Sequence, residues 1–67
     1  MSIKVPKKVK EGIDAVRDSG LTNMFDRPYV EKLCESMGYR KAAKWIQRNK
    51  TEYVTGIFEG FEVGEEE

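Results

Sequence analysis

The chain has 67 residues, with 12 Lys and Arg, 12 Asp and Glu, one Cys and no His, so its formal net charge is zero. A chain of this length forms one small domain, and a single Cys excludes an internal disulfide. The absence of His also excludes the usual zinc ligand sets and catalysis by Ser-His or Cys-His pairs.

The first predicted helix spans residues 6–19. Four apolar residues recur at spacings of 4, 4 and 3 and therefore share one helical face: Val5, Val9, Ile13 and Val16. Pro6 suits the first helical position, where its missing N–H costs nothing. Gly20 suits a left-handed C-terminal cap, and Leu21 is then expected to fold back onto Val16 in a Schellman ending.

A second helix is predicted from Asp26, which can cap it, with Pro28 in the first turn. Its apolar residues follow the i, i+3, i+4, i+7 pattern of one face: Val30, Leu33, Cys34 and Met37. Gly38 ends this helix, and Tyr39 can return onto Cys34. Because Cys34 lies on the apolar face, we expect a buried and unreactive thiol.

A third helix follows at once, over residues 39–48. Its apolar side carries Tyr39, Ala42, Ala43 and Ile46. Its opposite side carries four cations within a sector of about 100°: Arg40, Lys41, Lys44 and Arg48. We call these four residues the basic face. Trp45 lies at the edge between the two sides.

The last helix is predicted to start at Asn49, because the run Asn49-Lys50-Thr51-Glu52 has the form of a capping box. One apolar stripe follows: Tyr53, Val54, Ile57, Phe58 and Phe61. The acidic segment from residue 62 should fray, since its like charges repel and sit unfavourably at a helix C-terminus. No segment alternates with period 2, so we expect an all-α bundle of about four short helices and no sheet. The domain covers residues 1–62, and residues 63–67 form the tail.

The basic face and Trp45 make the first candidate binding surface. Trp and Arg are enriched in the hot spots of protein interfaces, which favours a protein partner. Cations on one helical face also suit nucleic-acid phosphates, and the second and third helices with Gly38 between them resemble a helix-turn-helix. That resemblance weakens at Lys44 and Gln47, where the motif needs buried aliphatic residues, and the acidic tail opposes a polyanion. The alternatives are a plain solvated face and a Trp45 that only closes the core.

Glycines at a spacing of four make the second candidate surface: Gly56, Gly60 and Gly64. Gly56 and Gly60 lie opposite the apolar stripe of the predicted fourth helix, where each costs about 1 kcal/mol relative to Ala. Close approach of another helix or backbone to that side would justify the cost. The alternatives are a helix that ends near Gly60 and an internal clash of any larger side chain.

No arrangement for catalysis is visible in the sequence. The Ser and Thr residues have no base to activate them, and no spacing brings two carboxylates together for acid–base chemistry. The glycines match neither the phosphate-binding loop nor the dinucleotide-binding pattern. We therefore expect a protein that is not an enzyme and holds no cofactor and no metal ion.

Three runs carry a further signal: residues 5–9 (VPKKV), residues 15–28 (AVRDSGLTNMFDRP) and residues 56–61 (GIFEGF). They resemble a family of small phage and prophage proteins that is classed as a domain of unknown function. The resemblance implies a virally encoded protein in the cytosol of a bacterial host, and it implies no catalytic activity. Small phage proteins commonly bind a host factor or a nucleic acid, so the resemblance favours binding over catalysis.

These observations combine into one functional hypothesis and one alternative. No apolar run approaches the ~20 residues of a membrane span and no signal-peptide core is present, which agrees with a soluble, cytoplasmic protein. We expect an accessory protein that binds a host or phage protein through Trp45 and the basic face, with Gly56 and Gly60 as a second surface. The alternative is a nucleic-acid-binding protein that uses the basic face. The sequence leaves the oligomeric state open.

Overall fold

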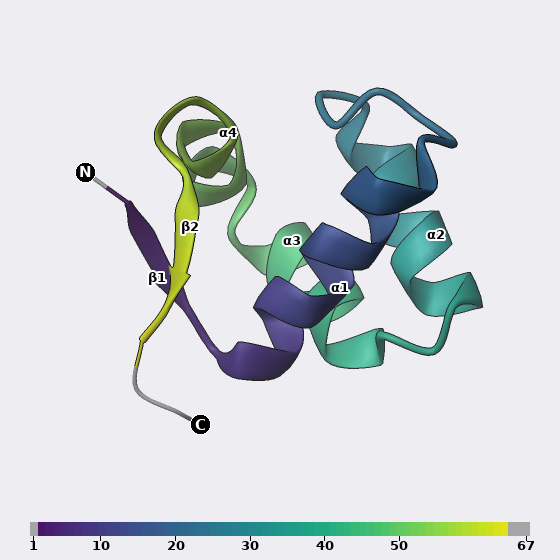
Figure 1. Cartoon of the computed structure of the whole chain (residues 1–67), viewed down its shortest axis with the longest axis horizontal. Coiled ribbons are helices and arrows are strands. Elements are labelled where there is room, and N and C mark those ends of the chain that lie inside the picture. The colour runs from purple at the N-terminus through teal and green to yellow at the C-terminus, as the bar shows by residue number, and fades with distance from the viewer. Residues whose placement is uncertain (1, 65–67) are drawn as a thin grey trace.

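The computed structural model describes residues 2–64, and Figure 1 shows how their helices and strands are arranged. Within this range, two three-residue strands bracket four helices along the chain. The elements in order are β1 (Ile3–Val5), α1 (Lys7–Ser19), α2 (Arg27–Ser36), α3 (Arg40–Arg48), α4 (Lys50–Glu59) and β2 (Phe61–Val63). The predicted all-α class with four helices is confirmed, and each helix lies within the range that the sequence predicts.

The expectation of no sheet is wrong, because β1 and β2 pair in parallel, with Ile3 opposite Phe61. The Ile3 N–H donates to the Gly60 carbonyl at 2.9 Å. The Gly64 N–H donates to the Val5 carbonyl, also at 2.9 Å. Strands of three residues are too short to show alternation, and each has its partner at the other end of the chain. No local pattern therefore predicts this pairing.

The pairing extends beyond residue 62, where the sequence places the start of the tail. Val63 belongs to β2, opposite Val5, and Gly64 makes the last hydrogen bond to β1. The rest of the predicted tail, residues 65–67, lies outside the described residues. The extent of the domain as drawn from the sequence stays a prediction.

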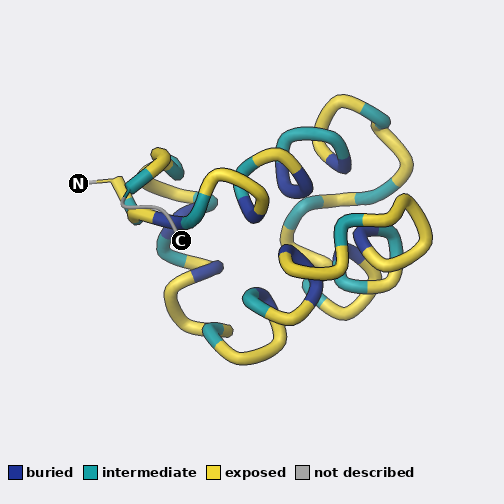
Figure 2. The backbone as a smooth tube through the Cα atoms, turned by 90° about the horizontal axis from the view of Figure 1, so that it is seen from below, coloured by how far each residue is buried: buried dark blue, intermediate teal, exposed yellow. Residues whose placement is uncertain are grey.

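The core lies between α1, α2 and α3, and α4 and the two strands close it on one side. Figure 2 shows the buried residues, in dark blue, turned toward the space between the elements. The buried apolar side chains are Val5, Val9, Ile13, Val16, Val30, Cys34, Ala42, Ala43, Ile46 and Tyr53, and two glycines, Gly12 and Gly56, are buried as well. The apolar faces predicted for the first three helices thus reach the core, except at Met37, which is 42 % exposed.

A close approach at Gly12 fixes how α1 crosses α3. A Cβ atom on Gly12 would lie 2.5 Å from the Ala42 Cβ and 2.9 Å from the Tyr39 Cβ. Carbon atoms in contact sit at about 3.5–4.0 Å, so only glycine fits here. The small residues on both helices bring the start of α1 next to α3, on the side where the candidate site lies.

The end of α2 has the predicted Schellman form. Gly38 is left-handed, with φ 92°, and its N–H donates to the Glu35 carbonyl at 3.1 Å. The Tyr39 N–H donates to the Cys34 carbonyl at 2.7 Å. These are the two hydrogen bonds of the motif, and they turn the chain directly from α2 into α3.

The end of α1 differs from its prediction. Gly20 is left-handed as expected, with φ 66°, but Leu21 is 63 % exposed and does not cover Val16. The Ser19 hydroxyl donates to the Val16 carbonyl at 2.6 Å and accepts the Leu21 N–H at 3.2 Å. The serine side chain thus stands between the two groups that a Schellman ending would join.

The predicted apolar stripe of α4 is wrong in part. Tyr53 is fully buried, but Val54 is 42 % and Phe58 74 % exposed. The buried face instead runs through Tyr53 and Gly56. The reason is that α4 ends at Gly60, so Phe61 leaves the helix and lays its ring on Gly56.

The predicted capping box at the start of α4 is also wrong. No side-chain bond caps α4, because the Asn49 side-chain amide donates to the Trp45 carbonyl at 3.0 Å. The backbone N–H of Asn49 donates to the same carbonyl at 2.8 Å. Asn49 therefore ends α3 with these two bonds, while its own carbonyl accepts the Tyr53 N–H at 2.9 Å in the first turn of α4. It is the N-cap residue of α4, as the sequence predicts, but its side chain makes no capping bond.

Candidate functional site

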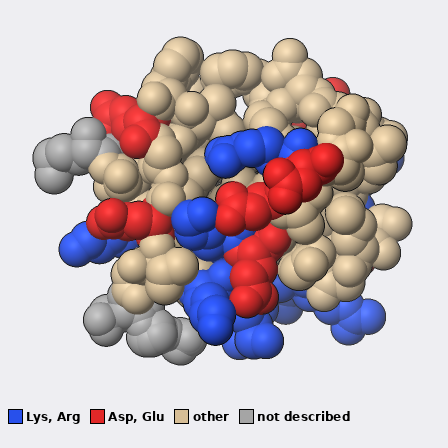
Figure 3. All heavy atoms as spheres, viewed as in Figure 1, with Lys and Arg blue, Asp and Glu red and all other residues tan. Residues whose placement is uncertain are grey.

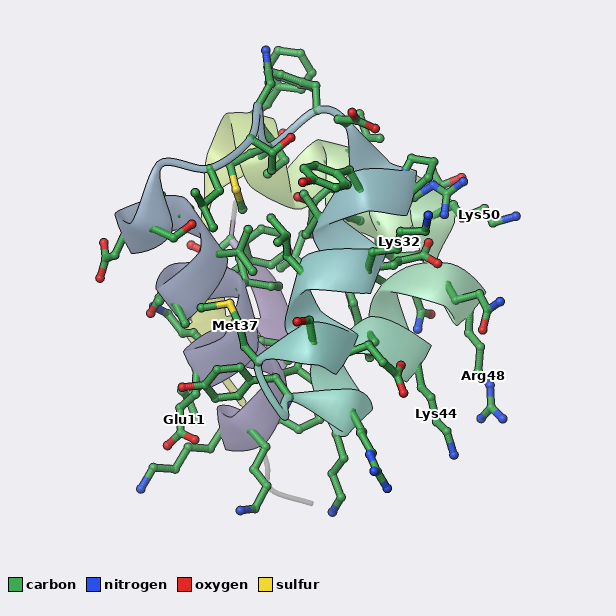
Figure 4. The ribbon with its side chains drawn as sticks, turned by 90° about the vertical axis from the view of Figure 1, so that its right-hand side faces the viewer. Glu11, Lys32, Met37, Lys44, Arg48 and Lys50 are labelled. Atoms are coloured by element: carbon green, nitrogen blue, oxygen red, sulfur yellow. The ribbon has the colours of Figure 1, made fainter. Side chains whose placement is uncertain are left out.

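The basic face lies on the solvent side of α3. Its four residues are all exposed, while Ala42 and Ile46 on the other side are fully buried. No ion pair within residues 2–64 involves any of the four. Figure 4 shows Lys44 and Arg48 extending from α3 into solvent. None of the four charges is therefore held in an ion pair by a described acidic side chain.

The first turn of α1 adds a cation to this surface. Lys8 lines a shallow hollow together with Arg40 and Lys41, at the point where α2 turns into α3. Figure 3 shows Lys and Arg side chains gathered along the lower edge of the molecule, where α1 and α3 begin in Figure 1. The sequence shows Lys8 only as part of a basic run. Its place beside α3 depends on the helix crossing at Gly12.

A second hollow lies on the same side, between α3 and the start of α1. Its volume is about 340 Å³, and its lining consists of Pro6, Val9, Lys41, Lys44, Trp45, Arg48 and Asn49. We call it the Trp45 hollow. Three of the four residues of the basic face line it, and its lining contains no acidic residue. The sequence did not indicate it, because Pro6 and Val9 lie more than thirty positions away from α3.

Trp45 is held in place where it borders this hollow. It is half-buried, and its indole packs edge-on against the Phe61 ring, with centroids 6.2 Å apart and an angle of 82°. Its backbone carbonyl accepts the two hydrogen bonds from Asn49. Trp45 therefore closes part of the core, as one alternative expected, and also presents surface to the hollow.

Acidic residues border the basic face on both sides. Toward α2, a third hollow is lined by Glu31 and Glu35 as well as by Lys32 and Lys44. Toward α1, Glu11 lies in the hollow with Lys8. The cations of α3, which have no ion pair within residues 2–64, thus form a narrow strip between these acidic residues, and Lys8 continues the strip onto α1.

The structure gives internal reasons for the two candidate glycines. A Cβ on Gly56 would lie 2.2 Å from two atoms of the Phe61 ring, and Gly56 itself is buried. Gly60 has φ 99° and ends α4. Both alternatives considered for these glycines, an internal clash and an early helix end, are therefore observed. Phe61 separates Gly56 from Trp45, so the two candidate surfaces do not form one site.

Among the described residues, two groups have raised pKa values, the Cys34 thiol and the Tyr53 hydroxyl. Both lie in the core and not at the basic face. Burial raises the pKa of the Cys34 thiol to about 11, with a smaller contribution from the charge of Glu31. Burial also raises the pKa of Tyr53 to about 12, with a smaller contribution from Cys34. The Tyr53 hydroxyl donates to the Met24 carbonyl at 2.6 Å. A thiol with a raised pKa is a poor nucleophile, which agrees with the unreactive Cys34 expected from the sequence.

Two further observations apply to residues 2–64. None of the helices there has the length and apolar character that crossing a bilayer requires. No group of three or more Cys, Asp and Glu side chains in this range is placed to hold a metal ion. Lys44 and Gln47 are both exposed, so α3 lacks the buried aliphatic residues that a helix-turn-helix needs at those positions.

The comparisons with known proteins identify a family. A family model described as "Domain of unknown function (DUF5049)" matches residues 5–61. The chain therefore belongs to this family, whose description assigns no activity. Neither a curated protein nor a solved structure matches the chain.

Proposed function

We propose that this member of the DUF5049 family is a non-enzymatic binding protein that docks its basic face on an acidic surface of a protein partner. The observation that carries the proposal is the strip of uncompensated cations along α3, next to the Trp45 hollow. Opposite charge on a partner speeds encounter and fixes orientation. The resemblance of three sequence runs to phage and prophage proteins supports a virally encoded protein whose partner is a host or phage factor in the bacterial cytoplasm.

The shape of the charged strip favours a protein over a nucleic acid. A polynucleotide carries phosphates at regular spacing and would extend past the strip toward Glu35 on one flank or Glu11 on the other. Glu31 lies on the first flank as well, in an ion pair with Arg27. A compact acidic surface can match the strip without meeting these carboxylates. Because the cations of α3 lie between acidic residues, they favour a short acidic segment over a long polyanion.

Nucleic-acid binding stays the second candidate because Lys8 extends the cations from α3 onto α1. This candidate makes a distinct prediction. Contact with six or more phosphates would reduce affinity by about a thousandfold or more between 50 and 200 mM salt. A protein partner held partly by apolar contact would lose much less.

The test titrates isotope-labelled protein with an acidic peptide and, separately, with a DNA duplex, at low and high salt. Our proposal predicts that the peptide shifts backbone amides of residues 40–48 and that K44E/R48E abolishes these shifts. K50E is the matched control, because Lys50 is an exposed cation outside all three hollows, and it should bind like the parent. Binding of the duplex more tightly than the peptide, or no binding of either, would overturn the proposal.

A further inference from the structure

We propose that the Trp45 hollow is an anchor pocket that takes one apolar side chain from an acidic segment of the partner. The inference rests on the proposed function and adds to it the kind of segment that is recognised: an apolar residue flanked by Asp or Glu. It assigns separate roles to the two parts of the hollow, the apolar floor and the charged rim.

The floor of the hollow is apolar and fixed. Val9 is 2 % exposed and belongs to the core, and Pro6 has a rigid ring. Trp45 is held by the Phe61 ring and by both hydrogen bonds from Asn49. A pocket whose walls are already ordered loses little conformational entropy when a ligand enters. The floor therefore suits a side chain that brings no charge.

The rim of the hollow is cationic. Lys41, Lys44 and Arg48 line it, and none of them has an ion pair within residues 2–64. The volume of about 340 Å³ is at the small end of the range for ligand pockets, and it has room for one apolar side chain of a partner. Charge complementarity thus places acidic residues on the rim, on either side of the buried anchor.

The same features argue against a phosphate in the hollow. An anion on the floor would lose its contacts with water and gain contacts with Val9 and Pro6, which offer it no hydrogen-bond donor. Burying a charge without a partner in this way is unfavourable. A nucleobase can stack on Trp45 while its phosphates reach the rim, so a single-stranded oligonucleotide is the informative competitor. Acidic residues outside the rim, at Glu31 and Glu35, favour the shorter peptide.

The experiment uses the emission of Trp45, the single Trp of the chain, to follow binding at the hollow itself. Three short peptides are compared: glutamates around a central leucine, the same peptide with a central serine, and the leucine peptide with glutamines in place of glutamates. We expect the leucine–glutamate peptide to bind at least about tenfold more tightly than the serine peptide, which corresponds to about 1.4 kcal/mol. The glutamine peptide should bind more weakly than either.

Each other outcome identifies which statement fails. Equal affinity for the leucine and serine peptides would overturn the anchor pocket while leaving the proposed docking on acidic partners intact. No binding of any glutamate peptide would overturn both. Tighter binding of single-stranded oligothymidine, with a change in Trp45 emission, would replace the peptide by a nucleic acid.

Variants check that the signal comes from the hollow. W45A removes part of the floor and also the single Trp of the chain, so its binding is followed by the backbone amide shifts of residues 40–48 in isotope-labelled protein. It should reduce the preference for leucine over serine, provided that its circular dichroism matches the parent. K44E/R48E removes two cations of the rim and leaves the floor intact, so it should weaken both glutamate peptides by a similar factor and keep whatever preference for leucine over serine is still measurable. The comparison of peptides on the unmodified chain stands even if W45A fails to fold.

Discussion

α3 and α4 follow each other along the chain and have 9 and 10 residues, yet they present opposite surfaces. α3 buries two alanines and an isoleucine and exposes cations. α4 buries Tyr53 and Gly56 and exposes Val54 and Phe58. The difference comes from what covers each helix: α3 packs against α1 and α2, whereas α4 packs against β1 and α3 and carries the Phe61 ring. A helix therefore buries the side that its neighbours cover, which need not be its most apolar side.

The two regions also differ in how firmly their close contacts are held. At Gly12 the neighbouring atoms are the Cβ of Ala42 in α3 and the Cβ of Tyr39, the N-cap residue of α3, and neither can move without the backbone. At Gly56 they belong to the far end of the Phe61 side chain, on a strand of three residues. We expect the first contact to be rigid and the second to be adaptable.

The largest effect is expected for G12A. A methyl group would lie 2.5 Å from the Ala42 Cβ and force α1 away from α3, and overpacking of this kind costs typically 1–3 kcal/mol, here about 3. A domain of this size has only a few kcal/mol of stability, so G12A should be largely unfolded in a urea titration. A42G in the same chain should restore part of the loss. A loss below about 1 kcal/mol would show that the α1–α3 contact is adaptable after all.

The second-largest effect is a loss of stability at alkaline pH, and it tests whether the buried Tyr53 holds α4 to the rest of the fold. The pKa of Tyr53 is raised to about 12 from its ordinary 10.0, so between these values the unfolded chain releases a proton that the folded chain retains. The free energy of unfolding must therefore fall as pH rises through this window, by roughly 2 kcal/mol. In Y53F the fall in the free energy of unfolding that comes from ionisation of Tyr53 is absent, whereas ionisation of Cys34 lowers the stability of both proteins. Parallel stability curves for the two proteins would contradict the prediction.

A smaller effect is expected for G56A. The methyl group would lie 2.2 Å from the Phe61 ring, and the ring would have to shift against Trp45 and Tyr53, on which it packs. A single side chain on a short strand still shifts more easily than a helix, and alanine gains up to about 1 kcal/mol of helix propensity over glycine. We expect a net loss of about 1 kcal/mol, with weaker amide protection in β2 measured by hydrogen exchange. Shortening the ring with F61L should remove most of the loss. A loss as large as that of G12A would mean that β2 holds Phe61 rigidly.

The sequence predicts the buried faces of α1, α2 and α3 but not that of α4, and the reason is physical. In α1, α2 and α3 the buried face follows helical periodicity, so residues such as Ile13, Val30 and Ile46 could be placed in advance. In α4 the buried face depends on the pairing of β2 with β1, which is non-local and leaves no periodic signal. The local pattern therefore favoured Phe58 for the core, although glycine was the residue that α4 had to bury.

The candidate site divides in the same way. The basic face could be predicted because four cations share one side of a single helix. The Trp45 hollow could not be predicted, because its floor includes Pro6 and Val9. These residues are far from α3 in the sequence and lie beside it only in the folded structure. That arrangement follows from the close approach at Gly12, which no spacing within α3 reveals.

The smallest effect is expected for F58S, and it sharpens the comparison within α4 itself. Phe58 is 74 % exposed, and its main aromatic neighbour is Phe25, 53 % exposed, with ring centroids 5.4 Å apart. Such a pair contributes about 0.5–1.5 kcal/mol beyond its buried area, and because both rings are solvated we expect a loss near the lower value. Y53S, on the buried face of the same helix, should cost about 3 kcal/mol or more.

Thermal unfolding of the two variants side by side measures the difference. A loss from F58S above about 1.5 kcal/mol would mean that Phe25 and Phe58 belong to the core and that α4 is held on two sides. The expected small loss would mean that the Phe25–Phe58 pair contributes little and that α4 is held by its buried side, which includes Tyr53 and Ile57. In that case the ring of Phe58 is available on the surface and contributes little to holding the fold together.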